Sequence, residues 1–580
     1  MPFGGPFISH EEVFSRRSTL EEIKEILFAL DPVESLALLC QMNADLRLVK
    51  REKGEYGNLQ SELAGGMFDD ETISRLKKRF PTVHCGDRPL FHTTQILNIM
   101  RLAAAYCSGS EKPLAAEAAR YKIGSACLMM NDLFLTEEEK VAISTGKEDS
   151  RRSALMTQML GPFEIVNTQA ITHLMYRSRV MYRILLRDER IITRIKRNCG
   201  GFDFEKQFLD ATNISLTTWL FLIFLSYAYL IHYKSEDGSR NFQHLGIDRT
   251  VFRGQSKIAA DELDAFLHTM ALPLKQFKEL LAAKRPVDWR FDFTPFKGKP
   301  LVELHPNKYF CTDLGFLMEK MHSGVYWTLF DAMTDRRPLF QAWGILFEEY
   351  VNWFLNDRKF HSSAIFYASP EWSDGSECFD GAFLQDSRFM PMEYKGKVLK
   401  LEARYSGDAA AFESDVDLKI VEGCDQLAWK IEALFANDRT KQRRLKYIPL
   451  RQITRVVPVL VVQDHILRGP LVNWRLNQRF NEILNRGAIH PSITVDSLNV
   501  VGIQELETMA ESAEGGQFDI FHGLQLRCFK DPEMKSELQE FLSAIPGYGS
   551  GKSERIDTVM QQQFEELAEY SFGKSSLSNS

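Results

Sequence analysis

Two acidic residues and a lysine lie close together in the C-terminal half of the chain. Asp380 comes thirteen residues before Glu393, and Lys395 follows Glu393 after one intervening residue. Side chains alternate between the two faces of a strand, so Glu393 and Lys395 would share one face. Neighbouring carboxylates repel each other, and Mg²⁺ relieves that repulsion while it also takes water and phosphate oxygens as ligands. The three residues therefore predict a metal-dependent site that cleaves phosphodiester bonds.

The lysine supplies the other part of this chemistry. An ammonium group can orient the attacking water, depress its pKa or stabilise the charge that builds on phosphorus. The metal ion polarises the phosphoryl oxygen and can carry the nucleophilic hydroxide. We therefore expect Asp380 and Glu393 to hold Mg²⁺ or Mn²⁺, and Lys395 to act in catalysis.

A β-hairpin would bring these residues together. Residues 377–384 and 389–395 alternate in polarity, and the polar segment 385–388 separates them. Pro391 removes a hydrogen-bond donor from the second strand, so we expect that part of the strand to be bulged or to lie at an edge.

The segments around the hairpin predict an α/β domain. Helices are expected over 337–356, 423–435 and 470–484, and 453–462 is an apolar, β-branched run that suits a buried strand. In this order of elements, helices cover a mixed sheet on both faces.

These features together resemble the PD-(D/E)xK nuclease superfamily, which has a restriction-endonuclease-like fold. The features are Phe347-Glu348 and Val351 on a helix, Asp380, Glu393-x-Lys395, and Gln426-Leu427 on the next helix. The resemblance covers roughly 300–484 and implies metal binding by Asp380 and Glu393 and catalysis by Lys395. It also implies a supporting acidic, metal-binding role for Glu348 and a positioning role for Gln426. The sequence departs from the family pattern at Phe379, where proline is usual, and at the bulky Tyr394.

Each of these residues has an ordinary alternative. Glu393 and Lys395 could form the solvated face of a half-buried strand, with Asp380 in a turn. Asp415-x-Asp417-x-Lys419 contains the same short pattern, although 417–435 is better explained as helical. Glu348 could be a surface residue or be replaced by Glu349, and Gln426 could be an ordinary polar residue near a helix start.

The first half of the chain is predicted to be mainly α-helical. Apolar residues recur at helical spacing from about residue 19 to residue 281, for example at Leu20, Ile23 and Leu27. Prolines cluster just after Arg285, which marks a domain boundary. We predict a helical recognition or partner domain over 1–285, the nuclease-like domain over 286–531, and a helical tail with a disordered end over 532–580. Ile214–Tyr233 carries no charge and suits either a buried core helix or, as the alternative, a membrane span.

Composition sets wider limits on function. A net charge of −7 and a pI near 6.1 neither support nor exclude binding to nucleic acid. Two basic segments, 177–197 and 438–446, could contact phosphates or be solvated faces. Nine cysteines occur singly, without a CxxC pair, and the first residues lack the pattern of a signal peptide. A cytoplasmic location fits best.

Two further motifs carry weaker chemical signals. Residues 546–553 resemble a phosphate-binding loop, but Pro546 replaces its first glycine and a helix is expected before it. His84 and His92 have no second cluster of metal ligands and are expected in a loop before a helix.

The sequence thus predicts a nuclease with Mg²⁺ or Mn²⁺ as cofactor and nucleic acid, DNA rather than RNA, as substrate. The helical half would bind a partner protein or form a homo-oligomer, and membrane association is not expected. A helical region ahead of such a nuclease resembles prokaryotic defence or restriction effectors. The alternative is a nuclease-like subunit that has lost catalysis and serves in binding or scaffolding.

Overall fold

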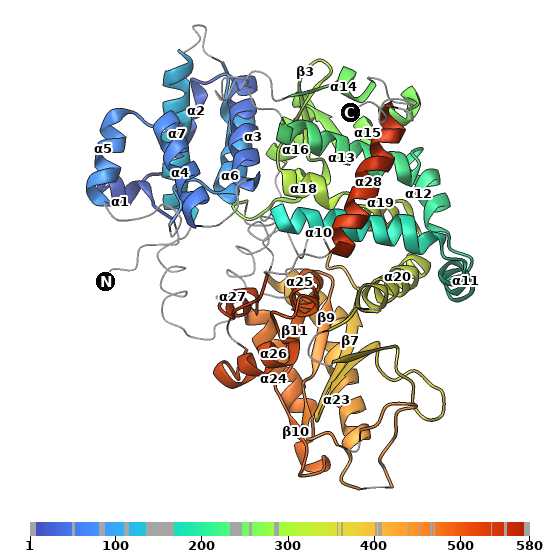
Figure 1. Cartoon of the computed structure of the whole chain (residues 1–580). Coiled ribbons are helices and arrows are strands. Elements are labelled where there is room, and N and C mark those ends of the chain that lie inside the picture. Colours follow the sequence, from blue (N-terminus) through green and yellow to red (C-terminus); the bar gives the residue numbers. More distant parts are fainter. Residues whose placement is uncertain are drawn as a thin grey trace.

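The computed structural model describes most of the chain. The described residues are 7–48, 53–80, 88–109, 115–134, 168–232, 246–253, 258–283, 289–356, 358–360, 364–400, 403, 409–438, 440–450, 452–464, 467, 470–534, 536, 538–549 and 554–572. The fold is mixed α/β, with helices in the N-terminal part and the larger of two sheets in the C-terminal half (Figure 1).

The N-terminal part is helical, as predicted. Its helices are α1 (His10–Phe14), α2 (Leu20–Phe28), α3 (Pro32–Leu48), α4 (Lys53–Met67), α5 (Asp70–Arg79), α6 (Thr93–Tyr106) and α7 (Ala116–Phe134). The helical spacing at Ile23 and Leu27 places both side chains in the core, and Thr19 caps α2 through the backbone N–H of Glu22. Apolar residues from these helices form a core that also includes Val302 and Phe310.

A second group of helices surrounds a small sheet. The helical segments are α10 (Thr168–Arg179), the π-turn Val180–Ile184, the 3₁₀ turn Leu185–Arg187, α11 (Glu189–Asn198), α12 (Phe204–Thr212), α13 (Leu216–His232), α14 (Arg249–Arg253), α15 (Ala260–Met270), α16 (Leu274–Ala282), α17 (Thr294–Gly298), α18 (Leu314–Glu319) and α19 (Ser323–Ala332). The strands, in spatial order, are β1 (Ile247–Asp248), β4 (Lys308–Cys311), β3 (Leu301–His305) and β2 (Ala271–Pro273). Strands β2 and β3 join the two sides of the predicted boundary at 285.

Residues 216–232 of the uncharged segment form α13, and Trp219, Leu222 and Ile223 on it are buried. Among the described residues, no single helix has the length and apolar character needed to cross a membrane. Helices α12 and α13, bent by 68° relative to each other, meet those criteria only as a pair.

The larger sheet carries the hairpin that the sequence predicted. Its strands are β5 (Ile365–Ala368), β6 (Gly381–Gln385), β7 (Arg388–Lys395), β8 (Arg455–Val456), β9 (Val459–Val462), β10 (Thr494–Val495) and β11 (Asn499–Gly502). Strand β6 pairs with β5 and β7 antiparallel, whereas β7 pairs with β8 and β9 parallel. Strands β10 and β11 extend the parallel part beyond β8 and β9.

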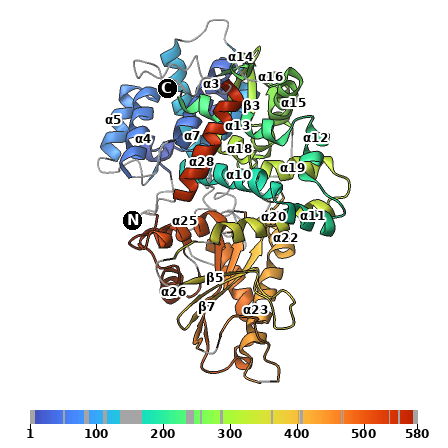
Figure 2. The ribbon, with the colours of Figure 1, turned by 45° about the vertical axis from the view of Figure 1, so that its right-hand side comes forward.

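Helices cover both faces of this sheet, as expected. Met392 and Tyr394 pack in one core with α20 (Arg337–Leu355) and α25 (Ile503–Glu514). Leu460 and Val462 pack in another core with α22 (Ala409–Lys419), α23 (Val421–Phe435) and α24 (Pro470–Ile483). Figure 2 shows α20 and α25 above the strands, between the sheet and the helical part of the molecule. The alternation of side chains along β7 therefore sends neighbouring residues to different helices.

The expectation for Pro391 was wrong. Strand β7 lies inside the sheet, with β6 on one side and β8 and β9 on the other, and Pro391 pairs with Ala382 without a bulge. The register of β7 with β8 continues into β9 and places Pro391 opposite Pro458. Because both prolines lack a donor, the expected strand 453–462 is divided into β8 and β9 at this point.

After α25 the chain forms α26 (Ile520–Lys530), α27 (Leu538–Ser543) and α28 (Glu554–Phe572). Helices α26 and α27 lie on the side of the larger sheet, next to α25, and α28 returns to the helical part (Figure 1). Helix α28 lies against α10 (Figure 1). An ion pair of 2.9 Å joins Arg179 on α10 to Glu566 on α28. One continuous core includes residues of α10, α20, one face of the larger sheet and α28. The predicted domain limits of 1–285, 286–531 and 532–580 stay predictions.

Three predicted features lie wholly or partly outside the described residues: the end of the tail (573–580), residues 550–553 of the loop-like motif, and His84. The described part of the loop-like motif follows α27 rather than a strand. His92 caps the start of α6, as expected for a loop before a helix.

Candidate active site

The hairpin places Asp380 beside Glu393. Gly381 pairs with Met392, so the residue before β6 lies opposite Glu393 on β7. The backbone N–H of Tyr394 donates a hydrogen bond of 2.5 Å to Oδ2 of Asp380. A side chain at position 381 would collide with the phenol oxygen of Tyr394. Glycine at this position therefore allows the Tyr394 ring to pack against β6.

The carboxyl group of Asp380 is perturbed by its surroundings. Burial raises its pKa to about 8, and the nearby carboxylates of Glu393 and Glu348 act in the same direction. The Tyr394 N–H and the Lys430 ammonium lower that pKa, but they do not reverse the shift. The site therefore favours a proton or a cation beside Asp380.

Glu393 and Lys395 both face α23. The Nζ of Lys395 donates a hydrogen bond of 2.6 Å to Oε1 of Gln426, and it lies 3.7 Å from Oε1 of Glu393. Gly423 allows this approach, because a Cβ atom there would lie 2.7 Å from Cε of Lys395. The structure thus brings together four of the predicted site residues: Asp380, Glu393, Lys395 and Gln426.

A second lysine in the site was not predicted. The Nζ of Lys430 donates a hydrogen bond of 2.7 Å to Oε2 of Glu393. Lys430 follows Gln426 by four residues on α23, which places both on one side of the helix. The spacing of four residues from Gln426 is the sequence feature that could have indicated Lys430.

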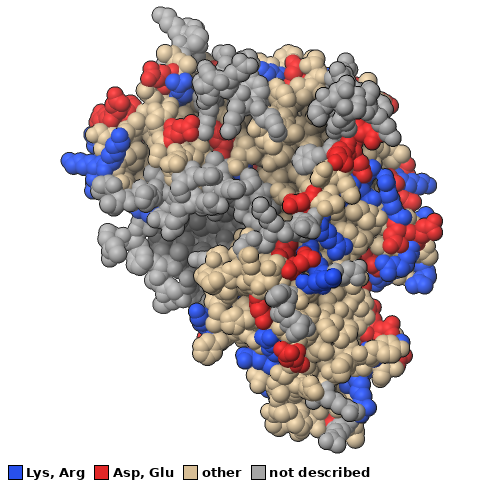
Figure 3. Space-filling view, in the orientation of Figure 1, with Lys and Arg blue, Asp and Glu red and all other residues tan. Residues whose placement is uncertain are grey.

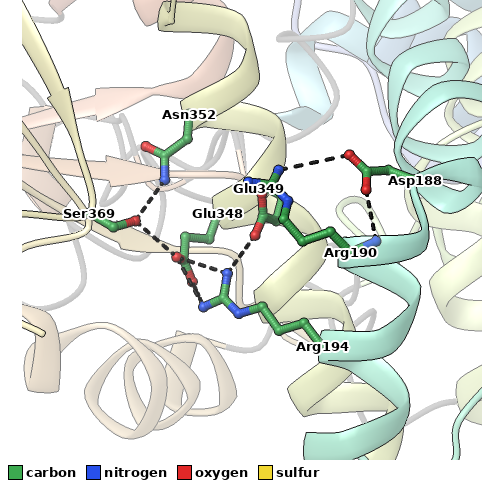
Figure 4. Close-up of polar contacts among 7 residues, drawn as sticks. All are labelled: Asp188, Arg190, Arg194, Glu348, Glu349, Asn352 and Ser369. Carbon is green, nitrogen blue, oxygen red and sulfur yellow. Dashed lines mark hydrogen bonds and ion pairs between the residues drawn. The ribbon is translucent and has the colours of Figure 1, made fainter.

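Glu348 is near the site but is paired with the helical part of the protein. Two hydrogen bonds of 2.9 and 3.1 Å join its carboxylate to Nη2 of Arg194 on α11, and Nη1 of Arg194 lies 2.7 Å from Glu349 (Figure 4). Burial raises the pKa of Glu348, while Arg194 acts against that rise. Both Glu348 and its predicted alternative Glu349 are therefore held by one arginine. The role of Glu348 as a metal ligand stays a prediction.

Ser369 links Glu348 to the hairpin. Its hydroxyl lies 3.4 Å from Oε1 of Glu348 and accepts a hydrogen bond of 3.1 Å from Asn352 (Figure 4). Its backbone N–H donates to the carbonyl oxygen of Asp380 at 3.0 Å. Ser369 has a φ of 42°, a conformation that non-glycine residues seldom adopt and that is often found at functional sites.

Tyr394, the bulky residue between the acid and the lysine, points to the opposite face of the sheet. Its side chain is buried in the core that includes α20, and its hydroxyl lies 3.3 Å from Oδ1 of Asn352. Burial raises the pKa of Tyr394, and the carboxylates of Asp380, Glu348 and Glu393 add to that rise. The bulky side chain of Tyr394 therefore packs in the core on the opposite face of the sheet and does not enter the site.

The donor set suits a cation with water ligands better than an all-protein cage. Within the described residues, no group of three or more His, Cys, Asp and Glu side chains is arranged to hold a metal ion. Asp380 and Glu393 nevertheless form a pair of carboxylates, and the raised pKa of Asp380 means that its charge lacks full compensation. Mg²⁺ commonly uses one or two carboxylates and keeps several waters. The pair fits such an ion.

The competing acid-lysine triplet lies on a helix. Residues 415–419 belong to α22, where Lys419 pairs with Asp415 at 2.9 Å and Asp417 pairs with Arg475 at 2.7 Å. The helical prediction for this segment is confirmed, and the triplet is separate from the hairpin.

The first basic segment, 177–197, is largely used in internal ion pairs. Arg177 pairs with the buried Glu507 at 2.9 Å, Arg179 pairs with Glu566, and Arg194 holds Glu348 and Glu349. On the side of the molecule formed by α11 and α12, basic and acidic side chains are interspersed (Figure 3). Contact of this segment with phosphates stays a prediction, but most of its charge is already compensated.

Comparison of the chain with protein-family models, with curated proteins and with solved structures found no match. The functional argument therefore depends on the site itself.

Proposed function

We propose that this protein is a metal-dependent nuclease that hydrolyses phosphodiester bonds. The observation that carries the proposal is the pair formed by the partly buried Asp380 and the buried Glu393 on one hairpin, with Lys395 held beside them by Gln426. A carboxyl group whose pKa is strongly shifted, as that of Asp380 is, is typical of catalytic sites.

The residues have separate roles in this proposal. Asp380 and Glu393 would hold a hydrated Mg²⁺ or Mn²⁺, which when bound polarises the phosphoryl oxygen and lowers the pKa of its water. Lys395, fixed by Gln426, orients the attacking water and stabilises the negative charge that builds on the phosphoryl oxygens. The water oxygen forms a new bond to phosphorus and gives up one proton to solvent, and the bond from phosphorus to the leaving oxygen breaks as that oxygen takes up a proton from solvent.

The proposal is tested by incubating the purified chain with labelled DNA and RNA, with Mg²⁺, with Mn²⁺ and with a chelator. Cleavage is expected with metal and should fall by at least about 100-fold in Asp380→Asn, which removes a metal ligand, and in Lys395→Met, which removes the charge that stabilises the phosphoryl oxygens. Asp417→Asn is the matched control, since this acidic residue lies on α22 in an exposed pair with Arg475. Equal cleavage by the wild type and both site variants would remove the site from the reaction.

A non-catalytic binding or scaffolding subunit is the second candidate function. The observation that favours it is the 2.7 Å pair between Lys430 and Glu393, which places an ammonium group where a metal ion would compensate the carboxylate. In that case the wild type would cleave no substrate with either metal, and Lys430→Met would destabilise the fold. Recovery of metal-dependent cleavage in Lys430→Met would contradict the scaffolding role.

The architecture, a helical region ahead of the site, also fits our proposal that the nuclease serves in prokaryotic defence or restriction. DNA is the favoured substrate in that setting, with the helical part binding a partner or a second copy. An infection assay with the Lys395→Met variant as control would test this role.

A further inference from the structure

An exposed tryptophan lies on α23 next to the site. Trp429 is 53% exposed, and its ring packs edge to face on the buried Trp372 with centroids 6.3 Å apart. Tyr447, in the segment that follows α23, is 86% exposed and has a φ of 65°. Large aromatic side chains in water carry an unfavourable hydration cost, so their exposure near a site points to a ligand.

Basic side chains accompany these rings. The guanidinium of Arg443 lies 3.9 Å from the ring of Trp372 and 6.0 Å from that of Trp429. The Nζ of Lys446 lies 5.1 Å from the ring of Tyr447. We call these five residues, Trp372, Trp429, Arg443, Lys446 and Tyr447, the aromatic platform.

The aromatic platform is held in place by backbone contacts. Trp372 forms a β-bridge with Leu445, and the N–H of Lys446 donates to the carbonyl oxygen of Glu371 at 2.9 Å. Arg443 also pairs with Asp374 at 2.8 Å, and Lys446 pairs with Glu371 at 3.1 Å. A surface that is already ordered loses little conformational entropy when a ligand binds.

The aromatic platform adjoins the candidate active site. Lys430, the residue after Trp429, donates to Glu393, and its Nζ lies 5.7 Å from the ring of Phe379, the residue before Asp380. The aromatic platform and the candidate active site therefore meet on α23, where Trp429 precedes Lys430.

The chemistry of the aromatic platform selects one kind of ligand. Exposed rings stack on unpaired bases, whereas the bases of a duplex are already stacked on each other. Guanidinium and ammonium groups attract the phosphates of the same strand. The pairs of Arg443 with Asp374 and of Lys446 with Glu371 are largely exposed, so they are weak and compensate these two charges only in part. A ligand that offers both unpaired bases and phosphates, next to a phosphodiester-cleaving site, is a single-stranded nucleic acid.

We propose that the aromatic platform binds single-stranded nucleic acid and stacks an unpaired base on Trp429 beside the bond to be cleaved. This inference rests on the proposed nuclease function and specifies its substrate class. DNA and RNA share the required chemistry. The strand would run from the aromatic platform across α23 to Asp380 and Glu393.

The test measures binding of the full chain to a labelled single-stranded oligonucleotide by fluorescence anisotropy, at fixed salt and with a chelator to prevent cleavage. Trp429→Leu removes the stacking ring and Trp429→Phe retains one. We expect Trp429→Leu to weaken binding by about 5- to 150-fold, the equivalent of ~1–3 kcal/mol per stacked base. Trp429→Phe should retain most of the affinity. Phe529→Ala is the control, because Phe529 is 81% exposed but lies on α26.

The same assay includes a duplex of the same sequence and an RNA strand. Single-stranded DNA or RNA that binds more tightly than duplex supports the inference. Equal binding by Trp429→Leu and wild type, tighter binding of duplex, or no binding of any nucleic acid overturns it, and the last result would leave the surface to a protein partner.

This outcome is distinct from that of the cleavage test. Cleavage that depends on Lys395 but not on Trp429 would sustain the nuclease and remove the stacking role. Binding that depends on Trp429 without cleavage would sustain the aromatic platform and remove the nuclease.

Discussion

Asp380 must lose a proton before it can hold a cation, and its surroundings make that loss difficult. Its pKa is raised to about 8, first by burial and then by the charge of Glu393. Metal ions compete with protons for carboxylates, so the affinity for Mg²⁺ should rise with pH up to the pKa of this group.

The first prediction concerns this competition. Between pH 5 and 7, the affinity of the wild type for Mg²⁺ should increase by about tenfold per pH unit, and less steeply between pH 7 and 8, because one proton is displaced from Asp380. Isothermal titration calorimetry at several pH values measures it. Asp380→Asn should bind the ion weakly at all of these pH values. An affinity of the wild type that does not change with pH would mean that Asp380 is not the group displaced.

The same group affects stability without metal. Its pKa in the folded chain lies above its ordinary value of 3.8, so the folded chain holds the proton more tightly than the unfolded chain. This contribution to stability is complete below about pH 3.8 and is lost as the pH rises through about 8. Asp380→Asn should therefore be more stable than the wild type at pH 9 in a chelator, with the difference smaller at pH 5. Urea denaturation of both proteins at the two pH values measures it.

At the scale of the elements, α11 and α20 are joined at the site by Arg194. The arginine connects residues 154 positions apart, Arg194 and Glu348, and also holds Glu349. The side chains of Glu348 and Glu349 are mostly buried, so the stability of their charged forms depends on Arg194 more than that of exposed carboxylates would.

The next prediction follows from this contact. Arg194→Met should lower the free energy of unfolding by roughly 1.5–3 kcal/mol, because two carboxylates lose a charged hydrogen-bond donor. Without this donor Glu348 lacks its countercharge near Asp380, so Mg²⁺ should raise Tm more in this variant than in the wild type. Differential scanning fluorimetry with and without Mg²⁺ tests both effects.

Arg190→Met provides the matched control for Arg194→Met. Arg190 lies on the same helix and 3.4 Å from Glu349, but its side chain is 76% exposed. Exposed pairs contribute about 0–1 kcal/mol, so this variant should remain close to the wild type. Equal stability and an equal response to Mg²⁺ in all three proteins would show that Arg194 does not restrain Glu348.

The elements that the sequence predicted are those with a strong local period. The hairpin, α20, α23 and α24 were placed within a few residues, because apolar spacing and turn residues define them locally. The alignment of Pro391 with Pro458 and the contact of Arg194 with Glu348 could not be predicted, since each joins distant segments through tertiary packing. Lys430 was missed for a different reason. Its position four residues after Gln426 was visible, but only the contact with Glu393 gives that spacing a meaning.

At the scale of the whole molecule, a buried polar network joins the helical part to the part that carries the larger sheet. Arg177 on α10 forms hydrogen bonds of 3.0 and 2.9 Å to Glu507 on α25, and the hydroxyl of Tyr350 on α20 donates to Glu507 at 2.5 Å. His173 lies 3.6 Å from the same carboxylate. The core around these residues extends from α10 to one face of the sheet. Unfolding of the helical part should therefore also disrupt the site.

The last prediction tests this connection with Glu507→Gln. The substitution leaves the buried guanidinium of Arg177 without its countercharge, which should lower the free energy of unfolding by about 3–5 kcal/mol. Circular dichroism at increasing urea reports the loss of helix, and residual cleavage reports the site. Because one core joins the two parts, both signals should be lost at the same urea concentration, and that concentration should be lower than for the wild type. Glu482→Gln, an exposed substitution on α24, should leave the midpoint unchanged. Separate midpoints for helix and cleavage would instead show that the nuclease-like part unfolds as an independent domain, with Glu507 as a local anchor between two units.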